Sequence, residues 1–278
     1  MVKKVVLPIA GLGTRFLPIS KTVPKEFLPL NAKPVIHYIV ESALQAKAKE
    51  FIFVISPEKR KVFQNYVRSY FLEGKKEVIA LLEKKGLKKE AEELKKVPKI
   101  KFRVALQKIP RGDGDAILKA EKFVKKEPFL VMFGDDVSFG KKSFAAQIVE
   151  VYKKYKKPVL SLYKKPKSEL SAYGVPKVKK LTSRVYRILD IVEKPKENPP
   201  SSFALVGNYV LTPEIFSYLK RAETFKGEII LANALKAMLK DGKEILGYHV
   251  EGTWLECGDL KKWIESFLFL SRFLGSRC

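Results

Sequence analysis

Apolar residues run in short blocks of strand length along the first 165 residues of the chain. Most blocks are continuous rather than alternating, as in strands of a parallel sheet that are buried on both faces. The block at residues 99–107 alternates apolar and polar positions instead. The expected strands are residues 3–10, 49–56, 99–107, 128–136 and 157–163.

Segments with apolar residues at helical spacing separate these blocks. Residues 34–46 show the pattern most clearly, with Pro34 at a first-turn position. Residues 75–96 are so highly charged that we expect an exposed helix. The other expected helices are residues 57–71, 115–124 and 142–155. Repeated strand–helix–strand units predict an α/β fold with a mostly parallel sheet and helices on both faces.

The pattern changes from about residue 173 onward. Strand-like runs with short connections suggest an α+β arrangement, followed by helices and a closing helix. The runs are expected strands at 173–181, 183–195, 203–213 and 244–252 and expected helices at 213–222, 228–240 and within 253–274. No internal repeat interrupts the chain, so we expect a single continuous domain over residues 1–278.

Composition excludes several classes of protein. The 278 residues are 46% hydrophobic, which is ample for a sizeable core, and no stretch reaches the roughly 18 apolar residues of a membrane helix. The apolar run near the N-terminus is shorter than that of a signal peptide. Cys257 and Cys278 form neither a disulfide framework nor a metal-type spacing. We therefore expect a cytoplasmic protein without membrane contacts.

The net charge of +25, from 55 basic and 30 acidic residues, is the most unusual bulk property. Such an excess attracts anionic metabolites, nucleic acid or acidic membranes, or it reflects a lysine-rich proteome. The lysines are dispersed along helices, and no basic motif with interleaved aromatic residues is present. Composition alone does not decide between an anionic ligand, nucleic acid, an acidic membrane and a lysine-rich proteome as the reason for the charge.

Three unusual stretches follow strands whose carboxyl ends should share one edge of the sheet, where ligands of such folds collect. They are "GLGTR" at 11–15, "QKIPRGDGDA" at 107–116 and "GDD" at 134–136. Gly11 and Gly13 allow a turn with exposed N–H groups, and Arg15 adds a forked cation suited to phosphate. The edge is therefore expected to bind a phosphorylated ligand.

The stretch "LPIAGLGTRFLPISKTVPKEFLPL" resembles the sugar-1-phosphate nucleotidylyltransferases, and "VPKEFLPL" resembles their bacterial UTP–glucose-1-phosphate uridylyltransferase branch. The resemblance continues in order through "GDD", "YGV", "IVEKP", "LVGNYVLTPEIF", "GEIILANAL" and "ECGDLKKWIESF". It implies a nucleotide-diphospho-sugar transferase (Rossmann-like) fold, a mixed sheet flanked by helices. Residues 1–165 would bind the nucleotide, and residues 166–278 would bind the sugar and include the C-terminal helix.

The resemblance also implies the reaction. UTP and glucose 1-phosphate would give UDP-glucose and pyrophosphate by an in-line displacement that requires Mg²⁺. The chemistry needs no covalent nucleophile and no acid–base histidine, and we expect His37 and His249 to be structural. Relatives of this kind imply a cytoplasmic homo-oligomer, a dimer or tetramer, with no specific nucleic acid partner.

Site residues are carried over from the resemblance position by position. Arg15 would clamp the triphosphate, Lys25 would neutralise the phosphates during transfer, and Asp135 would bind the metal. Asp136 would play a supporting or structural part. The remaining nucleotide contacts would be Ala10, Gly11, Gly13, Glu26, Gln107 and Gly112, and the sugar contacts Gly174, Glu193, Lys194 and Gly207, with Lys194 on the sugar phosphate.

Three stretches depart from the family pattern. "GDGDA" replaces the usual "GLGHA", which adds the carboxylates of Asp113 and Asp115. Glu256 stands where related enzymes carry an aspartate that is a second metal ligand, and "ILANA" replaces "QLTDA". A thymidylyltransferase, another base and sugar pairing, or an inactive nucleic-acid-binding or regulatory homologue therefore stay as alternatives.

Overall fold

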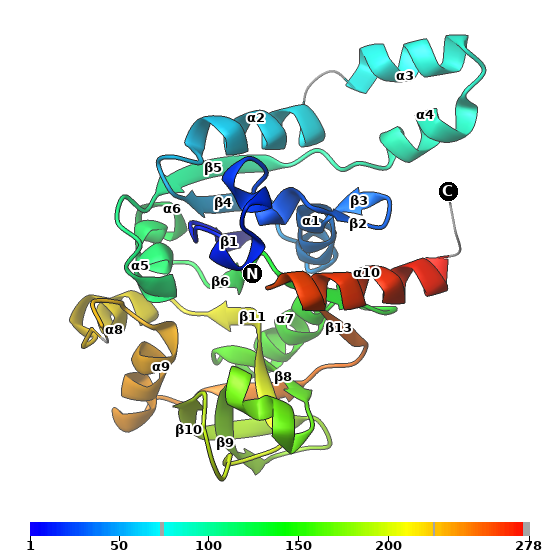
Figure 1. The fold of residues 1–278 in the computed structure, drawn as a ribbon. Coiled ribbons are helices and arrows are strands. Elements are labelled where there is room, and N and C mark those ends of the chain that lie inside the picture. The colour runs from blue at the N-terminus through cyan, green and yellow to red at the C-terminus, as the bar shows by residue number, and fades with distance from the viewer. Residues whose placement is uncertain (73–74, 225, 275–278) are drawn as a thin grey trace.

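A mixed sheet of nine strands forms the centre of the computed structural model, which describes residues 1–72, 75–224 and 226–274 (Figure 1). The strand order is β5-β4-β1-β6-β11-β8-β12-β10-β9. Four neighbours, β5, β4, β1 and β6, are parallel, and β11 is antiparallel to both β6 and β8. The strands are β1 Lys4–Pro8, β4 Glu50–Ile55, β5 Lys101–Leu106, β6 Phe129–Met132, β8 Val159–Lys164, β9 Gly174–Lys180, β10 Val185–Glu193, β11 Phe203–Leu211 and β12 Leu246–His249.

Two small antiparallel pairs lie outside the main sheet. They are β7 (Asp136–Phe139) with β13 (Thr253–Glu256), and β2 (Pro29–Leu30) with β3 (Lys33–Pro34). The pattern predicted neither β7 nor its partner as a separate sheet. Their pairing brings the residues after Asp135 beside the chain that enters the last helix.

The helices agree with the pattern except in two regions. The segment 115–124, expected as one helix, is divided at Ala120 into α5 and α6. Residues 75–96 were expected as one helix, and that prediction is wrong, because α3 ends at Lys84 and α4 begins at Lys88. Gly86 adopts a φ of +76° between them, a left-handed conformation that ends a right-handed helix. The helices are α1 Val35–Gln45, α2 Arg60–Phe71, α3 Lys75–Lys84, α4 Lys88–Lys95, α5 Gly112–Lys119, α6 Glu121–Val124, α7 Phe144–Tyr155, α8 Ile215–Arg221, α9 Leu231–Lys240 and α10 Leu260–Leu274.

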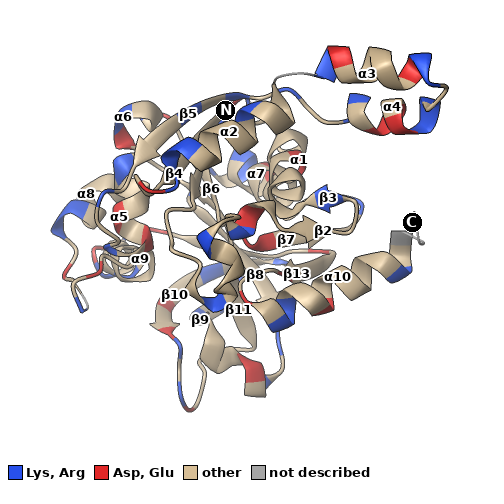
Figure 2. Cartoon of the chain, turned by 45° about the horizontal axis from the view of Figure 1, so that its top comes forward, with Lys and Arg blue, Asp and Glu red and all other residues tan. Residues whose placement is uncertain are grey.

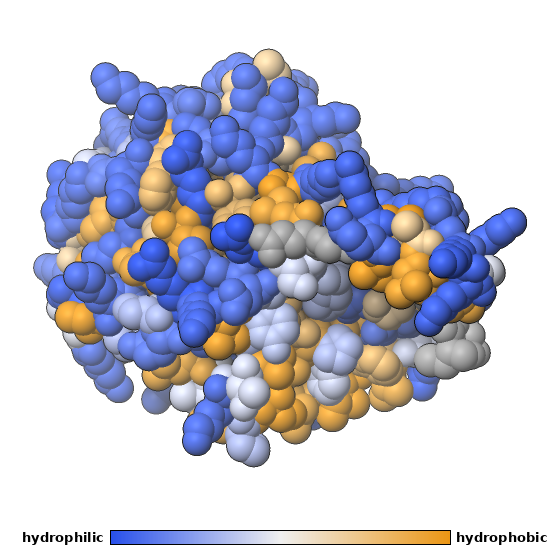
Figure 3. Space-filling model, turned by 90° about the horizontal axis from the view of Figure 1, so that it is seen from above, coloured by the Kyte–Doolittle hydropathy of each residue, from blue (hydrophilic) through white to orange (hydrophobic). Residues whose placement is uncertain are grey.

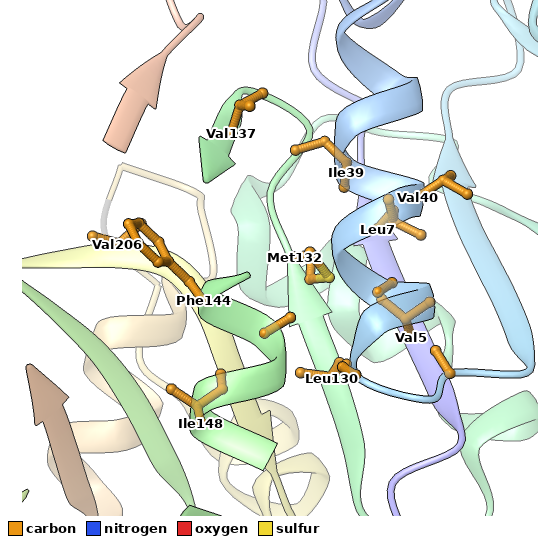
Figure 4. Packing of buried hydrophobic residues seen from close by; sticks show 14 of the residues in the cluster. Val5, Leu7, Ile39, Val40, Leu130, Met132, Val137, Phe144, Ile148 and Val206 are labelled. Atoms are coloured by element: carbon orange, nitrogen blue, oxygen red, sulfur yellow. The ribbon is translucent and has the colours of Figure 1, made fainter. Parts of the chain in front are cut away.

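Two apolar cores pack on opposite faces of the sheet. One is built from β1, β6, α1 and α7, where Leu7, Met132, Ile39 and Phe144 interdigitate (Figure 4). The other packs α5, α8 and α9 on the reverse face, with Phe129 stacked on Phe216 at a ring separation of 5.3 Å. Continuous apolar strands are buried on both faces, as the sequence predicted.

Strand β11 connects the two parts of the chain. All nine of its residues are buried, and it pairs with β6 on one side and β8 on the other. The parallel arrangement of β5, β1 and β6 also brings the three stretches noted in the sequence to the same edge. That edge holds the candidate site.

The surface is largely hydrophilic, and Lys and Arg lie on many separate elements rather than in one block (Figures 2 and 3). Hydrophobic side chains appear between them as patches on the face seen from above (Figure 3). Among the described residues, no helix is both long enough and apolar enough to span a membrane.

Candidate active site

An ion pair between Lys25 and Asp135 lies at the carboxyl edge of the sheet. Lys25 belongs to a short 3-10 helix, Lys25–Phe27, and its Nζ is 2.5 Å from Oδ2 of Asp135. Burial by itself would raise the pKa of the Asp135 carboxyl, but Lys25 and then Arg15 hold that pKa below its usual value. The carboxylate is therefore ionised and paired at neutral pH.

Gly258 lies close to this carboxylate. A Cβ atom at Gly258 would lie 3.3 Å from Oδ2 of Asp135 and 3.7 Å from the guanidinium of Arg15. Arg15 is exposed over 66% of its side chain and is 4.0 Å from Asp259. A side chain at position 258 would therefore crowd both the Asp135 carboxylate and the Arg15 guanidinium.

Both carboxylate oxygens of Asp136 accept hydrogen bonds from within the protein. Its Oδ1 accepts a hydrogen bond from the indole of Trp254 at 2.8 Å, and its Oδ2 accepts from the backbone N–H of Gly207 at 3.0 Å. Burial, followed by the charge of Asp135, raises the pKa of Asp136 to about 7. These contacts tie β7 to β13 and β11, which is a supporting role.

The glycine turn after β1 is followed by tight 3-10 structure. Gly13 has a φ of 67°, and its carbonyl accepts from the Ser20 hydroxyl at 2.8 Å. The Lys59 ammonium donates to the carbonyl of Gly11. Ala10 is buried, whereas no atom would contact a Cβ at Gly11, so this turn borders open space.

Glu26 carries a carboxylate that is buried without a partner. Its exposure is 1%, and neither oxygen accepts a hydrogen bond from the described residues. Burial raises its pKa, against the opposing charges of Lys25 and Lys59. Its Cγ would lie 3.0 Å from a Cβ at Gly134, so the side chain lies close under the loop that carries Asp135. A buried acceptor of this kind is suited to a ligand that donates a hydrogen bond.

Gln107 lies beside the first turn of α5. Its amide nitrogen donates to the carbonyl of Gly112 and to Oδ2 of Asp115, each at 2.9 Å. Helix α5 begins at Gly112, earlier than the start at residue 115 that the sequence suggested. Asp113 does not approach this amide: its Oδ1 accepts from the backbone N–H of Leu231 at 3.0 Å and ties α5 to α9.

A cavity of about 300 Å³ holds the four residues expected to contact the sugar. Gly174 and Glu193 are paired across β9 and β10, and a Cβ at Gly174 would lie 3.1 Å from Oε2 of Glu193. Lys194 follows with a φ of 48° and is exposed over 64% of its side chain. The lining consists of Asp113, Phe133, Asp136, Ala172, Tyr173, Gly174, Glu193, Lys194, Leu205, Gly207, Tyr209, Ile230, Leu231, Ala232 and Leu235.

Comparisons with known proteins identify the family of this chain. The family model described as "Nucleotidyl transferase" matches residues 3–272. This chain belongs to the nucleotidyl transferase family. The UTP–glucose-1-phosphate uridylyltransferase of Mycoplasma pneumoniae is 35% identical over 273 residues, which cover 96% of this chain and 92% of the relative. One of Bacillus subtilis is 36% identical over 272 residues, which cover 96% and 90%.

Solved structures confirm the fold. A UDP-glucose pyrophosphorylase complexed with UDP-glucose superposes with a TM-score of 0.85 at 35% identity, covering 98% of this chain and 100% of that one. The UTP-bound enzyme of Acinetobacter baumannii gives 0.86 at 28% identity, covering 99% and 95%. The predicted mixed sheet flanked by helices, and the resemblance on which it rested, are therefore confirmed.

Glu256 of this nucleotidyl transferase is surrounded by donors. Its carboxylate accepts from Lys165 at 2.8 Å and from the Tyr173 hydroxyl at 2.7 Å, and it also accepts from Lys262. The side chains of Lys165 and Lys262 also lie over the Tyr173 ring. The sequence did not predict these three partners, although it showed that Glu256 replaces the aspartate of related enzymes.

The two proposed metal ligands differ in how well they suit a divalent cation. Asp135 is an ionised carboxylate with one side-chain partner in the part of the chain that the structure describes, Lys25, and Mg²⁺ commonly uses one or two carboxylates together with substrate phosphates. Glu256 is already bonded to three donors. Among the described residues, no group of three or more His, Cys, Asp or Glu is placed to hold a metal. Asp135 fits a cation, and Glu256 in this arrangement does not.

Proposed function

We propose that this nucleotidyl transferase transfers a uridylyl group from UTP to glucose 1-phosphate, giving UDP-glucose and pyrophosphate. The Lys25–Asp135 pair supports this most directly. Next to Lys25 in the chain is the buried acceptor Glu26, and next to Asp135 is Asp136, which lines the sugar cavity. The ion pair therefore lies between Glu26, the proposed contact to the nucleotide base, and the cavity proposed to bind the sugar. Relatives named for this reaction along almost the whole chain add support.

In the proposed reaction, a phosphate oxygen of glucose 1-phosphate attacks the α-phosphorus of UTP. The new P–O bond forms as the bond to the bridging oxygen of pyrophosphate breaks, and pyrophosphate leaves with the electron pair. No proton transfer is required, so positioning and charge stabilisation supply the catalysis. Mg²⁺ bound at Asp135 would supply additional positive charge at the phosphates.

Each residue has a role that suits its place. Arg15 is exposed and free to reach the triphosphate, and Lys25 can transfer its contact from Asp135 to a phosphoryl oxygen. Glu193 would accept from sugar hydroxyls, while Lys194 at the cavity mouth would hold the sugar phosphate. The backbone at Ala10, Gly11, Gly13 and Gly112 would border the nucleotide, and Gly174 and Gly207 the sugar.

Pyrophosphate release tests the proposal. Purified protein would be assayed with glucose 1-phosphate and each of UTP, dTTP, ATP, CTP and GTP, with and without Mg²⁺. We expect strong Mg²⁺-dependent release with UTP. A clear preference for dTTP would replace the uridylyl assignment with a thymidylyl one, and silence with every nucleotide from folded protein would refute nucleotidyl transfer to this sugar.

A further inference from the structure

Asp115 is a buried carboxylate in contact with the glutamine on the base side. Its exposure is 3%, and its Oδ2 accepts from the amide nitrogen of Gln107 at 2.9 Å. Its Oδ1 pairs with Lys119 at 3.0 Å across one turn of α5. Both carboxylate oxygens therefore have partners, and one of those partners is Gln107.

The surroundings of Gln107 allow only one orientation of its amide. The Gly112 carbonyl and the Asp115 carboxylate both lie 2.9 Å from Nε2, and both are acceptors. Rotating the amide by half a turn would bring its oxygen against these two acceptors in a buried place, with two donors lost. The NH₂ group must therefore face Gly112 and Asp115.

The amide oxygen of Gln107 is left for a ligand. It accepts no hydrogen bond from the described residues, and it is not among their buried side-chain atoms that lack a partner. It is therefore in contact with solvent. Gln107 presents an acceptor there, whereas an unconstrained glutamine could present either an acceptor or a donor.

We propose that Asp115 is a positioning residue that holds Gln107 as a hydrogen-bond acceptor and so selects a pyrimidine with an N3–H donor over cytosine. The inference rests on the proposed function for the location of the base. Uracil carries a hydrogen on N3 that can donate to the amide oxygen. Cytosine has a lone pair on N3, which the same oxygen repels, and the amide cannot rotate to relieve the contact while its NH₂ group donates to Asp115 and Gly112.

The substitution Asp115→Asn tests this directly. Asparagine keeps the volume but can donate as well as accept, so a rotated Gln107 amide would gain a donor at residue 115 and keep one unfavourable contact, at the Gly112 carbonyl, instead of two. We expect the ratio of kcat/KM for UTP to that for CTP to fall by about tenfold or more, the size expected when a bad polar contact is relieved. The UTP to dTTP ratio should stay unchanged, because thymine and uracil share the N3–H edge.

Lys119→Met is the matched control. It removes the other partner of Asp115 from an exposed position and leaves the bond to Gln107 in place, so its UTP to CTP ratio should equal that of the wild type. Asp115→Ser, which can also donate, carries the same expectation as Asp115→Asn and serves if the asparagine variant does not fold.

Calorimetric titration of UTP and CTP into each protein, without sugar phosphate, separates the two proposals. A wild type that binds UTP over CTP but releases no pyrophosphate would refute the proposed function, and the loss of that binding preference in the Asp115 variants would still support the inference. Equal binding of UTP and CTP by the wild type, or an unchanged preference in folded Asp115 variants, would overturn the inference.

Discussion

The Lys25 ammonium, 2.5 Å from Oδ2 of Asp135, joins the proposed phosphate-neutralising cation to the proposed metal-binding carboxylate in one contact. Each group holds the other in its charged form, since Asp135 raises the pKa of Lys25 against the effect of burial. Phosphate groups entering the cleft would compete with Asp135 for the lysine. Lys25 and Asp135 are therefore both charged at the proposed reacting centre before the substrate binds.

Lys25→Ala should lower turnover by about 10² to 10³, the range seen when one group that stabilises transition-state charge is removed. UTP affinity should fall far less, because Arg15 and the backbone would still contact the nucleotide. Steady-state kinetics and calorimetric binding of UTP measure the two effects. Lys21→Ala, an exposed neighbour, is the control, and an unchanged kcat in Lys25→Ala would remove Lys25 from the catalytic set.

Asp135→Asn should abolish Mg²⁺-dependent activity while the protein stays folded. The amide has nearly the same volume but offers no negative charge to a cation. Pyrophosphate release, circular dichroism and Mn²⁺ binding by electron paramagnetic resonance together test this. Asp190→Asn on the surface should behave as wild type. Retained activity in Asp135→Asn would exclude that residue as the metal ligand.

Glu256→Gln should leave the Mg²⁺ concentration for half-maximal activity within about twofold of wild type, because this carboxylate is occupied by Lys165, Lys262 and Tyr173. The free energy of unfolding should fall by about 1–3 kcal/mol, the cost of weakening hydrogen bonds to a charged group. A Mg²⁺ titration and denaturant unfolding give the two numbers. A tenfold rise in the Mg²⁺ requirement would make Glu256 a metal ligand.

Glu26→Gln should stabilise the free protein at neutral pH by about 1–3 kcal/mol, because it removes a buried charge without a partner. UTP binding should weaken at the same time, since a neutral amide oxygen is a weaker acceptor than the charged carboxylate it replaces. Thermal unfolding with and without UTP would measure both. If the variant were less stable than the wild type in the absence of UTP, the Glu26 carboxylate would not be a buried group that lacks a partner in the free protein.

The stabilisation by Glu26→Gln should depend on pH. Burial raises the folded-state pKa of Glu26 above 4.5, so the folded protein holds the proton more tightly than the unfolded chain. Below about pH 4 both states are protonated, and the variant gains little. As the pH rises through 4.5 and then through the raised value, wild-type stability is lost, so the gain should be larger at pH 8 than at pH 4.

Asp113→Ala should destabilise the protein by about 1–2 kcal/mol, as the loss of a helix cap does, because Asp113 accepts from Leu231 at the start of α9. The KM for glucose 1-phosphate should rise, since Asp113 and α9 line the sugar cavity. Asp113→Asn keeps an acceptor oxygen and should retain most of the stability. Equal unfolding midpoints for wild type and the alanine variant would argue against this cap.

Local pattern was enough for much of the fold. The strands β1, β4 and β6 are continuous apolar blocks whose burial overrides other preferences. Parallel pairing with β5 then places Gly11, Gln107 and Asp135 along the same edge of the sheet. The break at Gly86 was not predicted, because one glycine among helix-forming residues is compatible with either state.

The finer contacts of the site depend on tertiary distance that the pattern does not contain. Asp115 reaches Gln107 only because α5 begins at Gly112, and Lys165 reaches Glu256 across 91 positions of sequence. Each of these acidic residues had looked like a departure that could harm the site. In the fold, Asp115 contacts the Gln107 amide and Lys119, and Glu256 contacts Lys165 and Lys262.

The position of β11 has a consequence for how the molecule unfolds. This strand comes from the later part of the chain, yet it lies between β6 and β8, which come from the earlier part. Cutting the chain near residue 165 would leave β6 and β8 without their shared neighbour and would expose nine buried residues of β11 in the other fragment. Neither piece should fold by itself, and the intact protein should melt in one cooperative transition, although the two pieces mixed together could reassemble.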